Sequence, residues 1–163
     1  MPMPEAETLF THDSAARGDS AVTVVIPLHN YGCYVTEALD SVAGQTIEKL
    51  DVIVVDDCST DDSASIARGW MEKNASRFHR AVVMKHVTNG GLAASRNSGF
   101  HRSQTEFVFP LDADNVLYPT CLAKLIRSLK NSRAAFAYCI LERFLTPAGV
   151  VPTPALMNID PWH

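Results

Sequence analysis

The sequence lacks several features that would assign the chain to a specialised class of protein. No apolar run approaches the ~18 residues of a membrane span, and the N-terminus has no basic segment followed by a hydrophobic one. The formal charge of −4 and the absence of a dense Lys/Arg block disfavour binding to nucleic acid. We therefore expect a cytoplasmic protein, free or peripheral at the inner membrane face, with no membrane span and no nucleic-acid partner.

The cysteines are few and far apart, which also excludes some sites. The chain has four cysteines, none of them in a Cys-x-x-Cys pair. This spacing disfavours a zinc knuckle or a redox motif. The histidines likewise show no His-x-x-x-His or Cys/His ligand spacing. Reduced thiols with a structural role are the expected state.

Strand-like and helix-like segments alternate along most of the chain. Such alternation predicts an α/β fold: a doubly wound, mainly parallel sheet with helices on both faces, similar to a Rossmann fold. The expected strands are residues 21–27, 50–57, 81–87, a buried run from 106 that ends at two aspartates, and 134–141; the expected helices are 34–45, one ending near 74, 92–101 and 121–130.

The two ends of the chain have a different composition. Residues 1–20 contain only Leu9 and Phe10 as large apolar residues, so we expect a mobile leader there. Residues 21–145 are the expected α/β domain. Residues 146–163 hold several prolines and no periodicity, which is typical of a loop or of the start of a further half of the fold.

An acidic pair, Asp112 and Asp114, flanks Ala113 at the end of the apolar run. The carboxyl ends of parallel strands form the edge at which open α/β sheets bind ligands. Two carboxylates there could share a divalent cation, which in turn could neutralise a diphosphate. Alternatively, the aspartates could simply end the strand and cap the next helix.

A second acidic pair, Asp56 and Asp57, ends the strand at 50–57. A free carboxylate there could accept the imide N–H of a pyrimidine base. The alternative is helix capping by Asp57 and Ser59. His29, in the turn after the first strand, could stack on a base or serve as a polar turn residue.

Arg96 stands among small residues on the helix expected at 92–101. Small neighbours favour close packing, so its guanidinium could pass between packed elements towards a nucleotide. The alternative is an ordinary surface arginine.

Four short motifs occur in order along the chain, and together they are more specific than any one of them. They are VVIPLHN at 24–30, VVDDCSTD at 54–61, NGGLAASRNSG at 89–99 and LDADN at 111–115. In order and spacing they resemble the family 2 glycosyltransferases of GT-A fold. The resemblance covers residues 22 to about 141.

The resemblance implies inverting transfer of a sugar from a nucleotide-sugar, favouring a UDP-sugar, to an acceptor hydroxyl with the help of Mg²⁺ or Mn²⁺. It places Asp57 at the base imide, Arg96 beside the nucleotide, and Asp114, together with Asp112, at the metal. The full set of donor-binding residues that it implies is Pro27, Leu28, His29, Asn30, Asp57, Asn89, Arg96, Asp112, Ala113 and Asp114.

One part of the family pattern is missing. The general base of the family is a carboxylate in the second half of the domain, and neither Glu142 nor Asp160 lies in a motif that resembles it. We therefore expect a donor-binding half, with the base beyond residue 163 and the acceptor, a glycan, lipid or protein, undefined.

Other functions fit the sequence less well. A sugar-nucleotide nucleotidylyltransferase would need a Gly-rich, basic loop after the first strand, and a dehydrogenase would need Gly-x-Gly-x-x-Gly there. A receiver domain would carry its acidic pair after the first strand rather than the second. A non-catalytic module that binds nucleotide-sugars stays open as an alternative.

Overall fold

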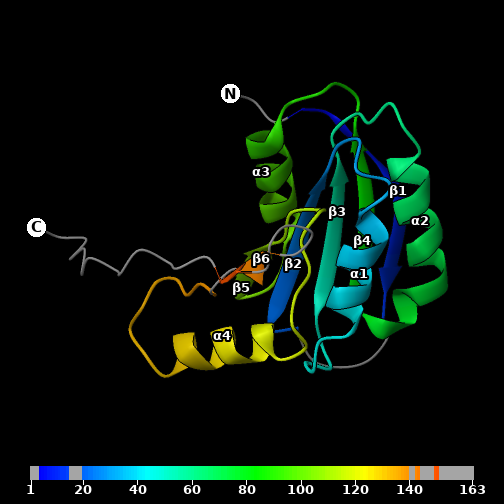
Figure 1. Cartoon of the computed structure of the whole chain (residues 1–163). Helices are drawn as coiled ribbons and strands as arrows, with labels where there is room; N and C mark the ends of the chain where they lie inside the picture. The colour runs from blue at the N-terminus through cyan, green and yellow to red at the C-terminus, as the bar shows by residue number, and fades with distance from the viewer. Residues whose placement is uncertain (1–3, 15–19, 140–141, 144–148, 151–163) are drawn as a thin grey trace, which may run out of the picture. The chain divides into compact units, whose positions relative to one another are not determined.

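A computed structural model of the chain describes residues 4–14, 20–139, 142–143 and 149–150. These residues fall into two compact units, one within 1–123 and one within 124–163. The first unit holds the sheet and the helices that pack on it (Figure 1).

The first unit contains five strands, and these agree closely with most of the expected segments. The elements in chain order are β1 (Ala6–Asp13), β2 (Val22–Leu28), α1 (Val35–Ala43), β3 (Asp51–Asp56), α2 (Ser63–Asn74), the 3₁₀ turn η1 (Ala75–Arg77), β4 (Arg80–His86), α3 (Leu92–Arg102) and β5 (Phe107–Pro110). Helix α4 (Cys121–Lys130) begins at the end of this unit, and the short strands β6 (Glu142–Arg143) and β7 (Gly149–Val150) pair in the second.

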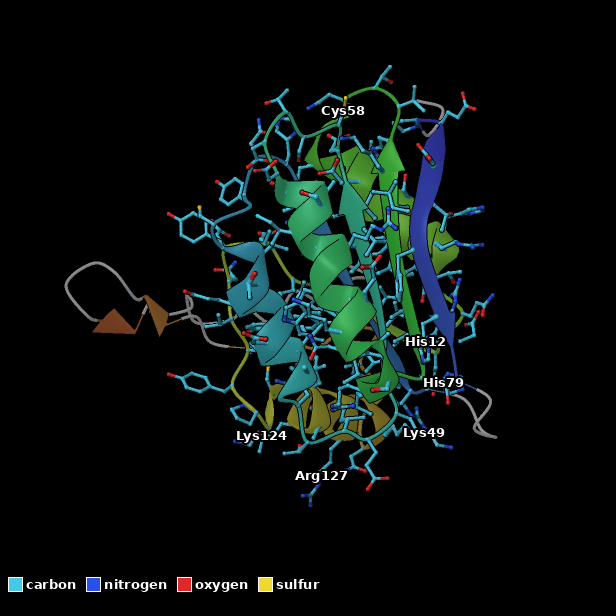
Figure 2. All side chains as sticks on the ribbon, turned by 90° about the vertical axis from the view of Figure 1, so that its right-hand side faces the viewer. His12, Lys49, Cys58, His79, Lys124 and Arg127 are labelled. Carbon is cyan, nitrogen blue, oxygen red and sulfur yellow. The ribbon has the colours of Figure 1, made fainter. Side chains whose placement is uncertain are left out.

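The five strands form one sheet in the order β1-β4-β3-β2-β5. Strands β4, β3, β2 and β5 are mutually parallel, and β1 pairs antiparallel with β4. Helices α1 and α2 lie side by side over one face (Figure 2), and α3 packs on the other (Figure 1). The expected α/β fold, with helices on both faces of a mainly parallel sheet, is confirmed.

The core lies at the two central strands. Every residue of β2 and β3 is buried, as β-branched strands covered on both faces should be. On the face under α3, Gly99 lies so close to Val25 that a Cβ at Gly99 would stand 2.2 Å from a Val25 methyl carbon. The absence of a side chain at Gly99 therefore sets how closely α3 approaches the sheet.

Strand β1 corrects the expectation of a mobile leader over residues 1–20. Its eight residues, Ala6–Asp13, pair with β4 along the edge of the sheet. An edge strand needs backbone partners and only one apolar side, and Leu9 and Phe10 are half-buried there. An edge strand buries few side chains, so a segment as polar as this one can form it although its composition does not indicate a core element.

Two further expectations about strands are wrong. Strand β5 is half-exposed rather than buried, because its only partner among the described residues is β2. Residues 134–139 form no strand in the described structure, since apolar composition does not supply a pairing partner. Residues 140–141 and most of the Pro-rich stretch 146–163 lie outside the described residues.

Candidate functional site

A cleft of about 340 Å³ opens at the carboxyl ends of the parallel strands. This volume is typical of a small-molecule site. Its walls come from the ends of β2 and β3, the loop from β4 to α3, and the loop after β5. The lining residues are Pro27, Leu28, His29, Tyr31, Asp57, Asn89, Gly91, Leu92, Ser95, Asp112, Ala113 and Asp114. The sheet edge predicted from the polar strand ends is therefore where the cleft forms.

Asp57 lies at the centre of this edge and is almost fully buried. Its Oδ1 accepts hydrogen bonds from the Gly90 amide at 2.8 Å and from His86 Nδ1 at 2.7 Å. Its Oδ2 accepts one from the Gly91 amide at 2.7 Å. Burial raises the pKa of the Asp57 carboxyl, but the bonds from Gly90, His86 and Gly91 outweigh it, so the pKa lies below its ordinary value. Asp57 is thus a charged acceptor on the cleft wall.

A different aspartate, Asp61, binds the first residue of the next helix, α2, whose N-cap residue Asp62 makes no side-chain cap hydrogen bond. Asp61 Oδ1 accepts a hydrogen bond from the Ser63 amide at 3.0 Å, and the Ser63 hydroxyl donates to the same oxygen. The Ser63 hydroxyl and amide lower the pKa of the Asp61 carboxyl. Ser59 instead receives a hydrogen bond from the Asn30 amide. The capping role considered for Asp57 and Ser59 is therefore not what the structure shows.

The side chains of His29 and Asn89 both hydrogen-bond to the backbone carbonyl of Asp57. His29 Nδ1 donates to the Asp57 carbonyl at 2.8 Å, and Asn89 Nδ2 donates to the same oxygen at 3.3 Å. Both residues line the cleft. His29 keeps an exposed ring, which suits a stacking surface.

Asn30 is predicted as a donor-site residue but is not among the lining residues of the cleft. Its backbone takes a positive φ of 56°. Its side-chain oxygen accepts hydrogen bonds from the Thr60 amide at 2.8 Å and from the Asp61 amide at 3.3 Å. Asn30 therefore ties the loop after β2 to the loop after β3.

Arg96 pairs with the first aspartate of the acidic motif. Its Nη2 lies 2.6 Å from Asp112 Oδ1, and neither side chain is deeply buried. Arg96 is not among the lining residues of the cleft. Arg96 therefore acts on the cleft indirectly, through its ion pair with the lining residue Asp112.

The acidic motif after β5 faces the cleft with all three of its residues, Asp112, Ala113 and Asp114. Within the described part of the chain, no group of three or more His, Cys, Asp or Glu side chains could hold a metal ion. Mg²⁺, however, is commonly held by one or two carboxylates together with substrate phosphates. One oxygen of Asp112 is paired with Arg96, whereas Asp114 is exposed. The two carboxylates therefore suit a cation whose remaining ligands come from a phosphate.

Sequence reasoning missed four lining residues, Tyr31, Gly91, Leu92 and Ser95. Tyr31 directly follows the motif that ends at Asn30. Leu92 and Ser95 are spaced by three on the first turn of α3, so they share one face of the helix. The position of Tyr31 and the spacing of Leu92 and Ser95 are both visible in the sequence, but they indicate a site only once the first turn of α3 is placed at the cleft.

The sequence of this chain is similar to those of known proteins. The family model described as "Glycosyl transferase family 2" matches residues 23–151. The glycosyltransferase GlyG of Streptococcus pneumoniae is 27% identical over 113 residues, which are 69% of this chain and 36% of GlyG. The uncharacterized glycosyltransferase YibD of Escherichia coli is 30% identical over 118 residues, which are 72% of this chain and 33% of YibD.

Solved structures are similar as well. S. aureus TarS 1-349 in complex with UDP has a TM-score of 0.57 at 34% identity, covering 63% of this chain and 30% of that one. The mannosyltransferase PcManGT from Pyrobaculum calidifontis, in complex with GDP-Man and Mn²⁺, has a TM-score of 0.56 at 29% identity, covering 61% of this chain and 29% of that one. This chain therefore spans about a third of the length of these relatives.

No helix in the residues that the structure describes is both long enough and apolar enough to span a membrane.

Proposed function

This chain belongs to glycosyltransferase family 2, and from that premise we propose that it is the donor-binding part of an inverting, metal-assisted enzyme that uses a nucleotide-sugar. The observation that carries the proposal is one cleft lined by both Asp57 and Asp114. A charged acceptor for a base and a carboxylate for a metal-bound diphosphate are thereby available to the two ends of one nucleotide.

We favour a UDP-sugar as the donor. The Asp57 carboxylate can only accept hydrogen bonds, and uracil offers an imide N–H whereas cytosine offers an acceptor at the same ring position. TarS is known in complex with UDP and with UDP-GlcNAc, which supports this choice. Guanine also presents N–H donors, and PcManGT is known with GDP-Man, so a GDP-sugar is the competing donor.

The phosphate end of the donor is assigned to the acidic motif. Asp114, with Asp112, would hold Mg²⁺ or Mn²⁺ together with the diphosphate. When bound, such a cation acts as a Lewis acid that stabilises the charge developing on the leaving diphosphate. Arg96 holds Asp112 in place through their ion pair, which leaves Asp114 as the carboxylate most free to meet the cation.

The transfer step needs a second set of groups. An acceptor hydroxyl attacks the anomeric carbon as the bond to the diphosphate breaks, and a general base that takes its proton is typically worth ~10²- to 10⁴-fold in rate. We propose that this base and the acceptor site lie outside the region described here, in a part that corresponds to the remaining length of the matched relatives. The acceptor would be a glycan, a lipid or a protein.

The test is a panel of nucleoside diphosphates titrated calorimetrically into the chain with Mn²⁺. UDP should bind more tightly than CDP and ADP. Asp57→Asn should weaken UDP binding by about 1–3 kcal/mol, since a charged acceptor is lost. Asp62→Asn, an exposed aspartate of the same loop, is the control and should bind UDP normally. Equal binding of the four nucleoside diphosphates UDP, CDP, GDP and ADP would contradict the assignment of Asp57 to the base.

A further inference from the structure

A chain of three side chains runs from the cleft wall into the core. His86 Nδ1 lies 2.7 Å from Asp57 Oδ1, and His86 Nε2 lies 2.9 Å from Ser98 Oγ. The His86 side chain has no solvent exposure, and Ser98 is 6% exposed. Three different elements are joined in this way, the ends of β3 and β4 and the middle of α3.

The partners determine which imidazole nitrogen carries the proton. A carboxylate with a low pKa only accepts hydrogen bonds, so His86 Nδ1 must be the donor to Asp57. In the neutral ring Nε2 is then an acceptor, and the Ser98 hydroxyl donates to it. The neutral tautomer protonated on Nδ1 satisfies both contacts.

The same three residue types form the triad of serine hydrolases, but access is reversed here. In a hydrolase the serine meets the substrate and the aspartate is buried behind the histidine. In this chain Asp57 lines the cleft, whereas Ser98 is buried and is not a lining residue. Nucleophilic chemistry at Ser98 is therefore not what this arrangement supports, and any role must act through Asp57.

The hydrogen bonds on Asp57 are unequally divided between its two oxygens. Oδ1 accepts from both His86 and the Gly90 amide, which fills its two lone-pair directions. Oδ2 accepts only from the Gly91 amide among the described contacts. One lone pair of Oδ2 therefore stays available to a ligand in the cleft.

We propose that His86 is a positioning residue for nucleotide recognition. It fixes the rotation of the Asp57 carboxylate so that Oδ2 offers an acceptor to the base, and it thereby sets the preference for uracil over cytosine. This inference rests on the proposed function, in which Asp57 meets the base. A merely structural histidine would support folding without affecting the choice of base.

Two substitutions separate these roles, because asparagine and glutamine mimic different nitrogens of histidine. His86→Asn keeps an amide donor near the Nδ1 position, within reach of Asp57, and gives up the contact with Ser98. His86→Gln places its amide near the Nε2 position and gives up the contact with Asp57. Both variants are polar and of similar size, so their effects on packing are comparable.

The readout is the ratio of the UDP and CDP dissociation constants with Mn²⁺, measured beside the thermal unfolding midpoint. His86→Gln should lose about tenfold or more of this discrimination, the value of one hydrogen bond to a charged group, whereas His86→Asn should keep most of it. Ser98→Ala should lower the unfolding midpoint and leave the ratio unchanged. Equal ratios in His86→Gln and the unaltered chain would overturn the inference.

A second measurement needs no variant. In ¹⁵N NMR spectra of the unaltered chain, His86 should be protonated on Nδ1, and its Nδ1 resonance should move when UDP saturates the cleft. A resonance that UDP binding leaves unmoved would overturn the inference while leaving the proposed function intact. Absence of any UDP binding would instead refute the proposed function, and the inference with it.

Discussion

Arg96 Nη2 donates to Asp112 Oδ1 across 2.6 Å, and this ion pair joins helix α3 to the acidic motif after β5. The side chains are 34% and 43% exposed, respectively. Ion pairs with this exposure contribute little to folding, typically about 0–1 kcal/mol. The pair is therefore better suited to orienting Asp112 at the cleft than to stabilising the domain.

Arg96→Met should accordingly weaken binding while sparing stability. We expect the UDP affinity in Mn²⁺ to fall about tenfold, the value of one charge-assisted hydrogen bond that orients Asp112. The free energy of unfolding in urea should change by less than about 1 kcal/mol. Arg68→Met breaks another exposed ion pair, with Glu72 on α2, and should change neither quantity appreciably. Equal UDP binding by both variants would contradict the orienting role of Arg96.

Two glycines on helices provide a matched test of the packing of α3. A Cβ at Gly99 would meet Val25 at 2.2 Å, whereas a Cβ at Gly69 on α2 would meet nothing within 4 Å. Gly99→Ala should lower the free energy of unfolding by about 1–3 kcal/mol through overpacking. Gly69→Ala should raise it by about 0.5–1 kcal/mol, because alanine favours the helix. Urea denaturation measures both, and loss of stability in Gly69→Ala would contradict this account.

The lowered pKa of Asp57 predicts a dependence of stability on pH. The pKa of Asp57 in the folded state lies below the ordinary value of 3.8. At pH values between these two pKa values, the folded chain therefore binds fewer protons than the unfolded chain. The stabilisation by Asp57 is therefore fully present above that ordinary value and is lost as the pH falls through the folded-state value. Asp57→Asn should be less stable than the unaltered chain at pH 7, and the difference should shrink in acid. Urea midpoints measured across this range test the prediction, and a constant difference would contradict it.

The central strands were the most predictable part of the fold. Each of the buried strands β2 and β3 holds a run of β-branched residues, Val22–Ile26 and Val52–Val55, so composition alone marks them. Edge strands leave a weaker mark. The polar segment Ala6–Asp13 forms β1 through its backbone pairing with β4, and β5 is apolar although it is half-exposed at the other edge. Pairing partners decide both cases, and these are not visible in the local sequence.

The site was predictable in its residue types but not in their contacts. Strand ends placed His29, Asp57 and Asp112 at one edge because parallel strands bring their carboxyl ends together. The bond from His86 to Asp57 could not be foreseen, since it spans 29 residues and depends on the packing of two strand ends. The ion pair of Arg96 with Asp112 likewise depends on how closely α3 approaches the sheet.

The most direct test of the account is the metal dependence of nucleotide binding at the cleft. Calorimetric titration of UDP should show binding in Mn²⁺ that weakens at least about tenfold when a chelator replaces the metal, or when Asp114 is changed to asparagine. Asp62→Asn serves as the control and should bind UDP like the unaltered chain in Mn²⁺. UDP binding that is indifferent both to the chelator and to Asp114→Asn would contradict the metal-assisted donor site proposed for this chain.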